Sequence, residues 1–439
     1  MLFAAFFAVL YAATAGIVYL AFTHTYKPVA ELDVLRAAMF ILLLPLLMKY
    51  VIQLCCAPFY SVKKWLRQKN VQINLQPSVS VLIPAWNEEV GILKTVQSVI
   101  NTQYPKLQLI VINDGSTDST HATISNFIEH TDLAGVDLKY LNLSNGGKAR
   151  AMNRGLKRAT GEIIVTIDAD SVMDVGALES LVAHFADPKV GGVAGNVVVA
   201  NRSRPIELMQ QMEYLYGFFF KRADSLFNSV YIIGGAAAAY RKTVLDEMGG
   251  FDHAIITEDI EMSVRILKHG YKTRYADDAV VYTEGPSEFK GLCNQRLRWK
   301  HGRLLTFLKH RKLFFSLSKE HNPYLTCMIL PLAVYAELLL LLEAALLTTF
   351  FAYTILTSNY WPLVFVIALL SSVIGVQILL DSKKRFHSNL FFLAPGAWLV
   401  FYLMDLIEFQ ALVRSLKRFV LARELKWQKW QRVGVGQIG

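Results

Sequence analysis

The chain has 439 residues, of which 54% are hydrophobic, and its formal net charge is +10. This hydrophobic fraction excludes an ordinary soluble enzyme and indicates membrane-spanning segments. Cys55, Cys56, Cys293 and Cys327 match no metal-site spacing and no disulfide framework, so we expect a reducing compartment. The basic residues cluster beside apolar runs without a nucleic-acid-binding module, which excludes nucleic acid as a partner.

Two apolar runs open the chain, and a basic segment follows them. Residues 1–22 are uncharged and long enough to span a bilayer, and residues 37–60 form a second run. The stretch SVKKWLRQKN begins at Ser61. Positive charge favours cytosolic membrane edges, so we expect the N-terminus and the segment after the second span to be cytoplasmic. The charge would equally suit an anionic substrate or lipid surface, and charge alone does not choose.

The middle of the chain alternates between strand-like and helix-like patterns. SVSVLIPAW, LQLIVIND and GEIIVTIDAD are β-rich apolar runs, whereas EVGILKTVQSVINT has helical periodicity. Strands that alternate with helices predict an α/β domain with a mostly parallel sheet. Ligands of such a domain bind at the carboxyl ends of the strands.

The C-terminal part contains three further apolar runs, at 324–356, 361–380 and 389–412. The stretch DSKKRFH between the last two is expected on the cytosolic side. Three crossings would then leave a basic tail on the opposite side, against the charge bias. Either one segment does not cross, or one run crosses twice, or the tail is an exception; Pro395-Gly396 marks an irregular point in the last run.

These patterns divide the chain into four parts. The predicted parts are two N-terminal transmembrane helices in 1–60, a cytosolic α/β domain with interfacial helices at its end in 61–314, about three transmembrane helices in 315–413, and a basic tail in 414–439.

Each of the three predicted strands ends in polar or acidic residues, in PAWNEE, NDGSTD and DAD. One such end would be an ordinary helix cap, but three in succession predict a polar-ligand site at one sheet edge. In DAD, Asp168 and Asp170 are one residue apart and can share a hard divalent cation with substrate phosphates. The alternative is a turn with exposed acids.

Two other motifs offer groups for phosphate binding and proton transfer. NGGKARAMNRGL places glycines and Lys148 before a helix, which suits a diphosphate, although the Walker A spacing is absent. TEDIEMS places Glu258 and Asp259 at a helix start. There the acids either stabilise the positive end of the helix or include a general base.

QRLRW, from Gln295, is the last motif before the chain becomes apolar. A helix would bring Gln295, Arg298 and Trp299 to one face, where the guanidinium can bind a phosphate and the indole can pack on a sugar ring. The alternative is a basic, aromatic helix on the bilayer surface.

IPAWNEE, NDGSTD, NGGKARAMN, DAD, TED and QRLRW, in this order and between membrane spans, resemble family 2 glycosyltransferases of the processive polysaccharide synthase type. The resemblance covers Val79 to Arg303 and is greatest to bacterial poly-N-acetylglucosamine synthases. It implies a Rossmann-like GT-A catalytic domain in the cytoplasm, attached to the inner membrane. The implied reaction is the processive, inverting polymerisation of a UDP-sugar, first of all UDP-N-acetylglucosamine, into an exported β-linked polysaccharide.

The resemblance also implies a role for each motif on the nucleotide side. Ala85, Glu88 and Asp114 would line the uridine pocket, with Asp114 at the uracil edge. Lys148 would lie near the nucleotide. The metal ligands, for Mg²⁺ or Mn²⁺, would be Asp168 and Asp170.

On the acceptor side, the implied general base is Asp259, beside Glu258. Arg298 would contact the diphosphate, Trp299 would lie under the acceptor sugar, and Gln295 would complete the site. The other cations of this stretch, Arg296, Lys300 and Arg303, fit a charged collar at the bilayer face.

The expected partners are the UDP-sugar, the growing glycan and the lipid bilayer. Control by a signalling nucleotide would require a small membrane partner subunit or a site at the membrane face. Three alternatives stay open: a transferase that adds one sugar to a lipid, a cellulose- or hyaluronan-type synthase, and a transporter or receptor with a nucleotide-binding domain. A transporter or receptor would give the TED and QRLRW motifs no function.

Overall fold

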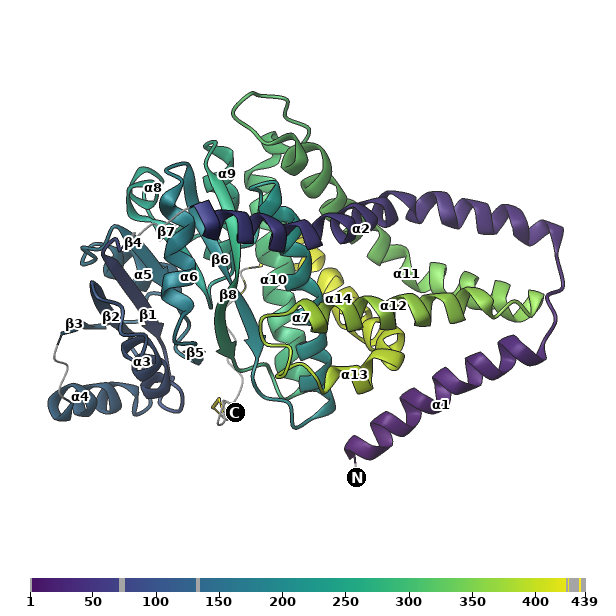
Figure 1. The fold of residues 1–439 in the computed structure, drawn as a ribbon, viewed down its shortest axis with the longest axis horizontal. Coiled ribbons are helices and arrows are strands. Elements are labelled where there is room, and N and C mark those ends of the chain that lie inside the picture. Colours follow the sequence, from purple (N-terminus) through teal and green to yellow (C-terminus); the bar gives the residue numbers. More distant parts are fainter. Residues whose placement is uncertain (1, 71–75, 132–134, 424, 426–433, 436–439) are drawn as a thin grey trace.

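The computed structural model describes residues 2–70, 76–131, 135–423, 425 and 434–435. A sheet domain forms one end of the molecule, and long apolar helices extend from it (Figure 1). The predicted strands and the predicted helix after PAWNEE are all present, with small shifts at their ends.

Among the described residues, one sheet contains eight strands in the order β3-β2-β1-β4-β7-β6-β8-β5. The strands are β1 Val79–Ala85, β2 Leu107–Asp114, β3 Asp137–Leu143, β4 Ile163–Thr166, β5 Ser171–Met173, β6 Val190–Val199, β7 Ala238–Arg241 and β8 Lys272–Thr283. β3, β2, β1 and β4 are parallel, and β7 is antiparallel to both its neighbours. The predicted α/β class with a mostly parallel sheet is confirmed.

The central strands are apolar because both faces of the sheet are covered. Val81 and Ile83 of β1 pack on one side with Val96 of α3 (Ile92–Ile100). Leu82 points to the other side and packs with Met152 of α5 (Lys148–Leu156). The remaining helices of this part are α4 Thr120–His130, α6 Ala177–Val182, η1 Ala183–Ala186 and α8 Lys242–Glu247.

Three helices connect the sheet domain to the apolar helices: α7 (Pro205–Leu226), α9 (Glu258–Lys268) and α10 (Phe289–Lys309). Met212 of α7 and Leu292 of α10 share a buried cluster with Leu10 and Ile374, which belong to apolar helices. The two parts of the molecule therefore pack through a common core.

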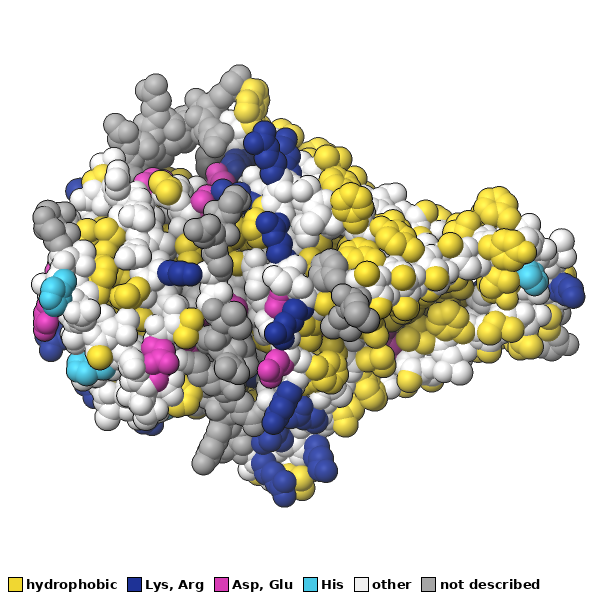
Figure 2. Space-filling view, turned by 90° about the horizontal axis from the view of Figure 1, so that it is seen from below, with side chains coloured by type: hydrophobic (Ala, Val, Ile, Leu, Met, Phe, Trp, Pro, Cys, Tyr) yellow, Lys and Arg dark blue, Asp and Glu magenta, His cyan; other side chains and the backbone are white. Residues whose placement is uncertain are grey.

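Five helical segments are long and apolar enough to cross a membrane, among the residues that the structure describes: Ala4–Thr23, Leu32–Leu66, Tyr324–Thr357, Trp361–Leu380 and Leu390–Val420. They comprise α1 (Leu2–Thr23), α2 (Ala30–Asn70), the π-helix η3 (Tyr324–Ile329) with α11 (Leu330–Thr357), α12 (Trp361–Leu380), and α13 (Leu390–Leu393), η4 (Ala394–Gly396) and α14 (Ala397–Val420). The short η2 (Arg311–Leu313) lies between α10 and η3. Figure 2 shows apolar side chains covering this part and Lys and Arg side chains along its border with the sheet domain.

The fifth apolar segment begins and ends beside the sheet domain. At its start, Gln211 of α7 donates a hydrogen bond to His387 at 3.3 Å. At its turn, Ser371, halfway along α12, donates to the Ala394 carbonyl at 3.0 Å. Near its end, the Arg414 guanidinium donates to Asn294 Oδ1 of α10 at 3.4 Å. The chain therefore enters the helical bundle to half its depth, turns at Pro395-Gly396 and returns.

This path bears on the position of the basic tail. Were α1, α2, α11 and α12 to cross a membrane, the N-terminus, the sheet domain and the end of α14 would lie on the same side of it. Gly434 and Val435 agree, because Gly434 N–H donates to Glu284 at 2.8 Å and Lys94 donates to the Val435 carbonyl at 2.7 Å. Most of the intervening tail lies outside the described residues.

Candidate active site

The carboxyl ends of β1 and β2 bring Ala85 and Asp114 to one edge of the sheet. Ala85 pairs with Asn113, the neighbour of Asp114. The Asp114 carboxylate accepts the backbone N–H groups of Gly146 and Gly147, at 2.9 and 2.8 Å. Burial raises the pKa of Asp114, and these two hydrogen bonds act in the opposite direction. Asp114 thus fixes the glycine turn that leads into α5.

Lys148, the first residue of α5, contacts two predicted site residues. Its Nζ lies 2.5 Å from Asp168 Oδ1 and 3.3 Å from Glu258 Oε1. Burial lowers the pKa of this amine, but the charges of Asp168, Glu258 and Asp259 outweigh burial, so the net pKa is raised. Lys148 is therefore a fixed cation within an acidic group.

Gly235 is the point where these residues meet. Its N–H donates to Asp259 Oδ2 at 2.8 Å. A Cβ atom at this position would lie 2.8 Å from Lys148 Nζ, 3.6 Å from Asp259 Oδ2 and 3.7 Å from Asp168 Oδ1. The DAD, TED and NGGKARAMN motifs, far apart in the sequence, therefore converge within a few ångströms of one backbone position.

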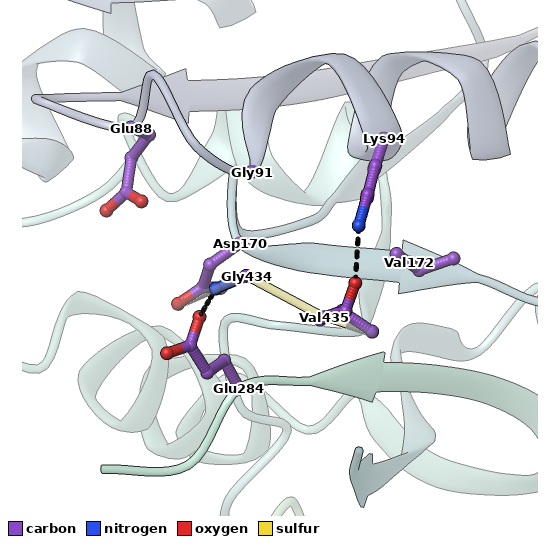
Figure 3. A pocket seen from close by; sticks show the side chains of 8 residues that line it. All are labelled: Glu88, Gly91, Lys94, Asp170, Val172, Glu284, Gly434 and Val435. Atoms are coloured by element: carbon purple, nitrogen blue, oxygen red, sulfur yellow. Dashed lines mark hydrogen bonds between the residues drawn. The ribbon is translucent and has the colours of Figure 1, made fainter. Parts of the chain in front are cut away.

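Asp170 faces a small pocket that also contains Glu88 and Glu284 (Figure 3). The PAWNEE turn packs directly on the DAD turn, because a Cβ at Gly91 would lie 3.0 Å from the Ala169 carbonyl oxygen. Sequence reasoning missed Glu284, although it follows β8 in the same way that the acids of the other motifs follow their strands. It also missed Lys94 and the tail residues Gly434 and Val435, which contribute to the lining. None of these three belongs to a recognised motif.

The two aspartates of DAD fit a divalent cation only with ligands from the substrate. Within the described residues, no group of three or more His, Cys, Asp or Glu side chains is arranged to hold a metal ion. One oxygen of Asp168 already accepts from Lys148. Asp170 and Asp168 would thus supply one or two carboxylate ligands, the number usual for Mg²⁺ bound with phosphates.

α10 carries QRLRW and packs tightly against TED. Any side chain at Gly302 would overlap Thr257, the residue before Glu258, so the two helices are in direct contact. Gln295 is buried, with 6% of its surface exposed, whereas Arg298 and Trp299 are half-buried. α10 therefore meets the start of α9 at Gly302, about one helical turn after Arg298 and Trp299.

Tyr214 of α7 is a neighbour that the sequence did not indicate. Its ring centre lies 6.4 Å from that of Trp299. Burial raises the pKa of Tyr214; the charge of Asp170 acts in the same direction, and that of Arg298 in the opposite one. Tyr214 is thus an aromatic neighbour of the QRLRW motif.

The expectation of a charged collar is wrong for Arg296 and Lys300. Both are buried, with 2% and 8% of their surfaces exposed. Arg296 pairs with Glu213 of α7 and Glu408 of α14, and Lys300 pairs with Glu408 and Glu337 of α11. The reason is tertiary: acids from three other helices pair with these cations inside the molecule.

The fold and the convergence of motifs define a nucleotide-sugar transferase, and the comparisons agree. Residues 77–302 match the model of the family described as glycosyltransferase like family 2, and the chain belongs to this family. The predicted GT-A type is confirmed by likeness to the mannosyltransferase PcManGT from Pyrobaculum calidifontis, solved with GDP-Man and Mn²⁺. The TM-score is 0.54 at 22% identity, over 85% of this chain and 99% of that one, which shows the fold alone.

Two relatives are more similar in sequence. Over 227 residues the chain is 35% identical to the poly-beta-1,6-N-acetyl-D-glucosamine synthase of Staphylococcus epidermidis, covering 51% of this chain and 54% of the relative. Over 246 residues it is 33% identical to the synthase of the same name from Staphylococcus aureus, covering 55% and 58%. The chain thus spans about half the length of the curated relatives it matches.

Proposed function

We propose that this glycosyltransferase uses a UDP-sugar, first of all UDP-N-acetylglucosamine, to extend a β-linked polysaccharide processively. The observation that carries the proposal is the meeting of Lys148, Asp168 and Asp259 at Gly235, beside the QRLRW helix. The similarity to two poly-beta-1,6-N-acetyl-D-glucosamine synthases supports the choice of donor and product.

Asp259 is the proposed general base. Its Oδ2 accepts the Gly235 N–H at 2.8 Å, and its Oδ1 accepts the N–H of Ile260 at 2.9 Å, so the carboxylate is held in one orientation. An acceptor hydroxyl would lose its proton to Asp259 while its oxygen forms a bond to C1 of the donor sugar. The bond from C1 to the phosphate oxygen breaks, and UDP leaves with the electron pair. This single displacement inverts C1 and gives a β-linkage from an α-linked donor.

The leaving UDP gains negative charge, and two cations of the chain are proposed to balance it. Lys148 is held by Asp168 and Glu258, and Arg298 offers a guanidinium that can contact two phosphate oxygens. A bound Mg²⁺ or Mn²⁺ at Asp168 and Asp170 would add further positive charge at the diphosphate. Ala85, Glu88 and Asp114 are proposed to hold the uridine.

The apolar helices are proposed to place the sheet domain at the cytoplasmic face of the inner membrane. The basic border in Figure 2 supports this side, because positive charge favours the cytosolic edge of a membrane. A polysaccharide is too polar to cross lipid unaided, so we propose that the helical bundle lines its path.

Donor screening tests the proposed function. Purified full-length protein is supplied with a panel of UDP-sugars, UDP release is measured, and products are digested with linkage-specific hydrolases. We expect UDP-N-acetylglucosamine to give a polymer, and Asp259→Asn to abolish both polymer and UDP release. A product that migrates as a monosaccharide-lipid would show that the enzyme adds one sugar to a lipid and does not polymerise. Unchanged turnover in Asp259→Asn would refute the assignment of the base.

A further inference from the structure

α10 carries three cations that lie among carboxylates from three other helices. We call this group the α10 charge cluster. Its members are Arg296, Lys300 and Arg303 of α10, Glu213 of α7, Glu337 of α11 and Glu408 of α14. The formal charges of the six side chains sum to zero.

Arg296 is the most enclosed cation of the α10 charge cluster. Its Nη2 lies 2.5 Å from Glu213 Oε2, and its Nε lies 3.5 Å from Glu408 Oε1. Only 2% of its surface is exposed. Buried ion pairs are weak evidence for stability, because the cost of desolvating both charges offsets their attraction. They do fix geometry, since breaking one pair leaves a buried charge without compensation.

The geometry that Arg296 fixes is that of Trp299. The Arg296 guanidinium carbon lies 4.3 Å from the centre of the Trp299 ring, within the range of a cation–π contact. Tyr214, which follows the Arg296 partner Glu213 in α7, is an aromatic neighbour of this indole. These two contacts of the indole therefore depend on the same turn of α7.

We propose that Arg296 is a positioning residue for the sugar acceptor: held by Glu213 and Glu408, it sets the plane of the Trp299 indole against which the acceptor sugar packs. The inference rests on the proposed function, because it takes Trp299 as the acceptor platform. Glu408 belongs to α14, so the acceptor site is complete only when the segment that returns from the helical bundle is in place.

The same contacts explain why the effect concerns the acceptor rather than the donor. Arg296 contacts the carboxylates of α7 and α14 and the indole, whereas the residues proposed for the uridine and the metal lie at the strand ends. Loss of the guanidinium frees the indole without removing any group that we assign to the uridine or the diphosphate. A selective change in acceptor affinity follows.

The test is a double-mutant cycle on the full-length protein, with N-acetylglucosamine oligosaccharides as acceptors and UDP-N-acetylglucosamine as donor. We expect Arg296→Met to raise the acceptor KM about tenfold, the scale of a lost desolvated cation–π contact, and to leave the donor KM and the UDP affinity unchanged. Arg296→Lys, which keeps the charge, should show an intermediate acceptor KM. In a Trp299→Ala background, Arg296→Met should cause no further rise, because the indole on which it acts is gone.

Lys290→Met is the matched control, since Lys290 is an exposed cation on the same helix. Its acceptor KM should equal that of the unmodified protein. If Arg296→Met and Arg296→Lys change donor and acceptor KM alike, or if the two effects add in the double variant, the positioning role is wrong. If Arg296→Met does not fold, Arg296→Lys and Glu408→Gln replace it in the test. A rise in acceptor KM without a rise in donor KM then supports the positioning role, and an equal rise in both contradicts it. Absence of transfer from every UDP-sugar by the unmodified protein would instead overturn the proposed function.

Discussion

Lys148 Nζ lies 2.5 Å from Asp168 Oδ1, and this contact joins the start of α5 to the turn after β4. The lysine is the centre of the site, because Glu258 lies on its other side at 3.3 Å. Replacing Lys148 by methionine would remove the ammonium that lies between Asp168 and Glu258. We expect Lys148→Met to lower UDP release about hundredfold or more, which an assay with UDP-N-acetylglucosamine measures. Lys157→Met, at an exposed position just after α5, is the control; equal activity of the two variants would contradict the prediction.

Gly235→Ala tests whether the close packing of Lys148, Asp168 and Asp259 around Gly235 is needed for activity. The new methyl group would lie 2.8 Å from Lys148 Nζ, so the lysine or the backbone has to move. We expect loss of most UDP release while the thermal unfolding midpoint changes little, because the clash falls on the end of the Lys148 side chain and not on backbone. Gly176→Ala is the control, since a Cβ there meets nothing within 4 Å. Full activity of Gly235→Ala would show that the close packing is not required.

Asp170→Ala and removal of divalent metal should have the same result. Asp170 faces the pocket with Glu88 and Glu284, and we assign it to the metal that binds the diphosphate. EDTA should abolish UDP release by the unmodified protein, and added Mg²⁺ or Mn²⁺ should restore it. In Asp170→Ala, added metal should restore little. Full activity in EDTA would remove the metal from the proposal.

Arg298→Lys should be far more harmful than its conserved charge suggests. A guanidinium contacts two phosphate oxygens at once, and an ammonium cannot reproduce this two-point contact. We expect a loss in kcat/KM of about hundredfold, corresponding to about 2.7 kcal/mol. Measurement of UDP release against donor concentration checks this. Activity close to that of the unmodified protein would assign Arg298 to a simple electrostatic role.

Lys221 gives a prediction for pH. Its Nζ lies 3.9 Å from the centre of the Phe218 ring, and burial lowers its pKa to about 8, from an ordinary value of 10.5. Between these two values the unfolded chain binds more protons than the folded protein, so this residue favours folding more as pH rises through the window. Below pH 8 its charge carries a full desolvation cost. Lys221→Met should therefore raise the unfolding midpoint at pH 7, and the gain should shrink towards pH 10. A gain independent of pH would contradict this assignment.

The local sequence determined most of the sheet domain. The run LQLIVIND has apolar residues on both faces of its strand, and β2 is buried along its whole length. Such a run can be stable only inside a covered sheet. The acids that follow the strands, Asp114 and Asp168 among them, then lie at the carboxyl edge as a consequence of parallel pairing. The fold and the positions of these motifs could therefore be predicted.

Tertiary structure decided what depends on partners far along the chain. The hydropathy pattern shows that residues 390–420 are apolar, but it does not show that this segment turns back at Pro395-Gly396. The direction of the segment is set by contacts with α7, α12 and α10. Charge patterning placed Arg296 at the bilayer face, whereas Glu213 and Glu408 bury it. The sequence by itself determined which residues carry charge and which runs are apolar. Only packing determined which charges meet, because an ion pair between helices is a property of their arrangement and not of either helix alone.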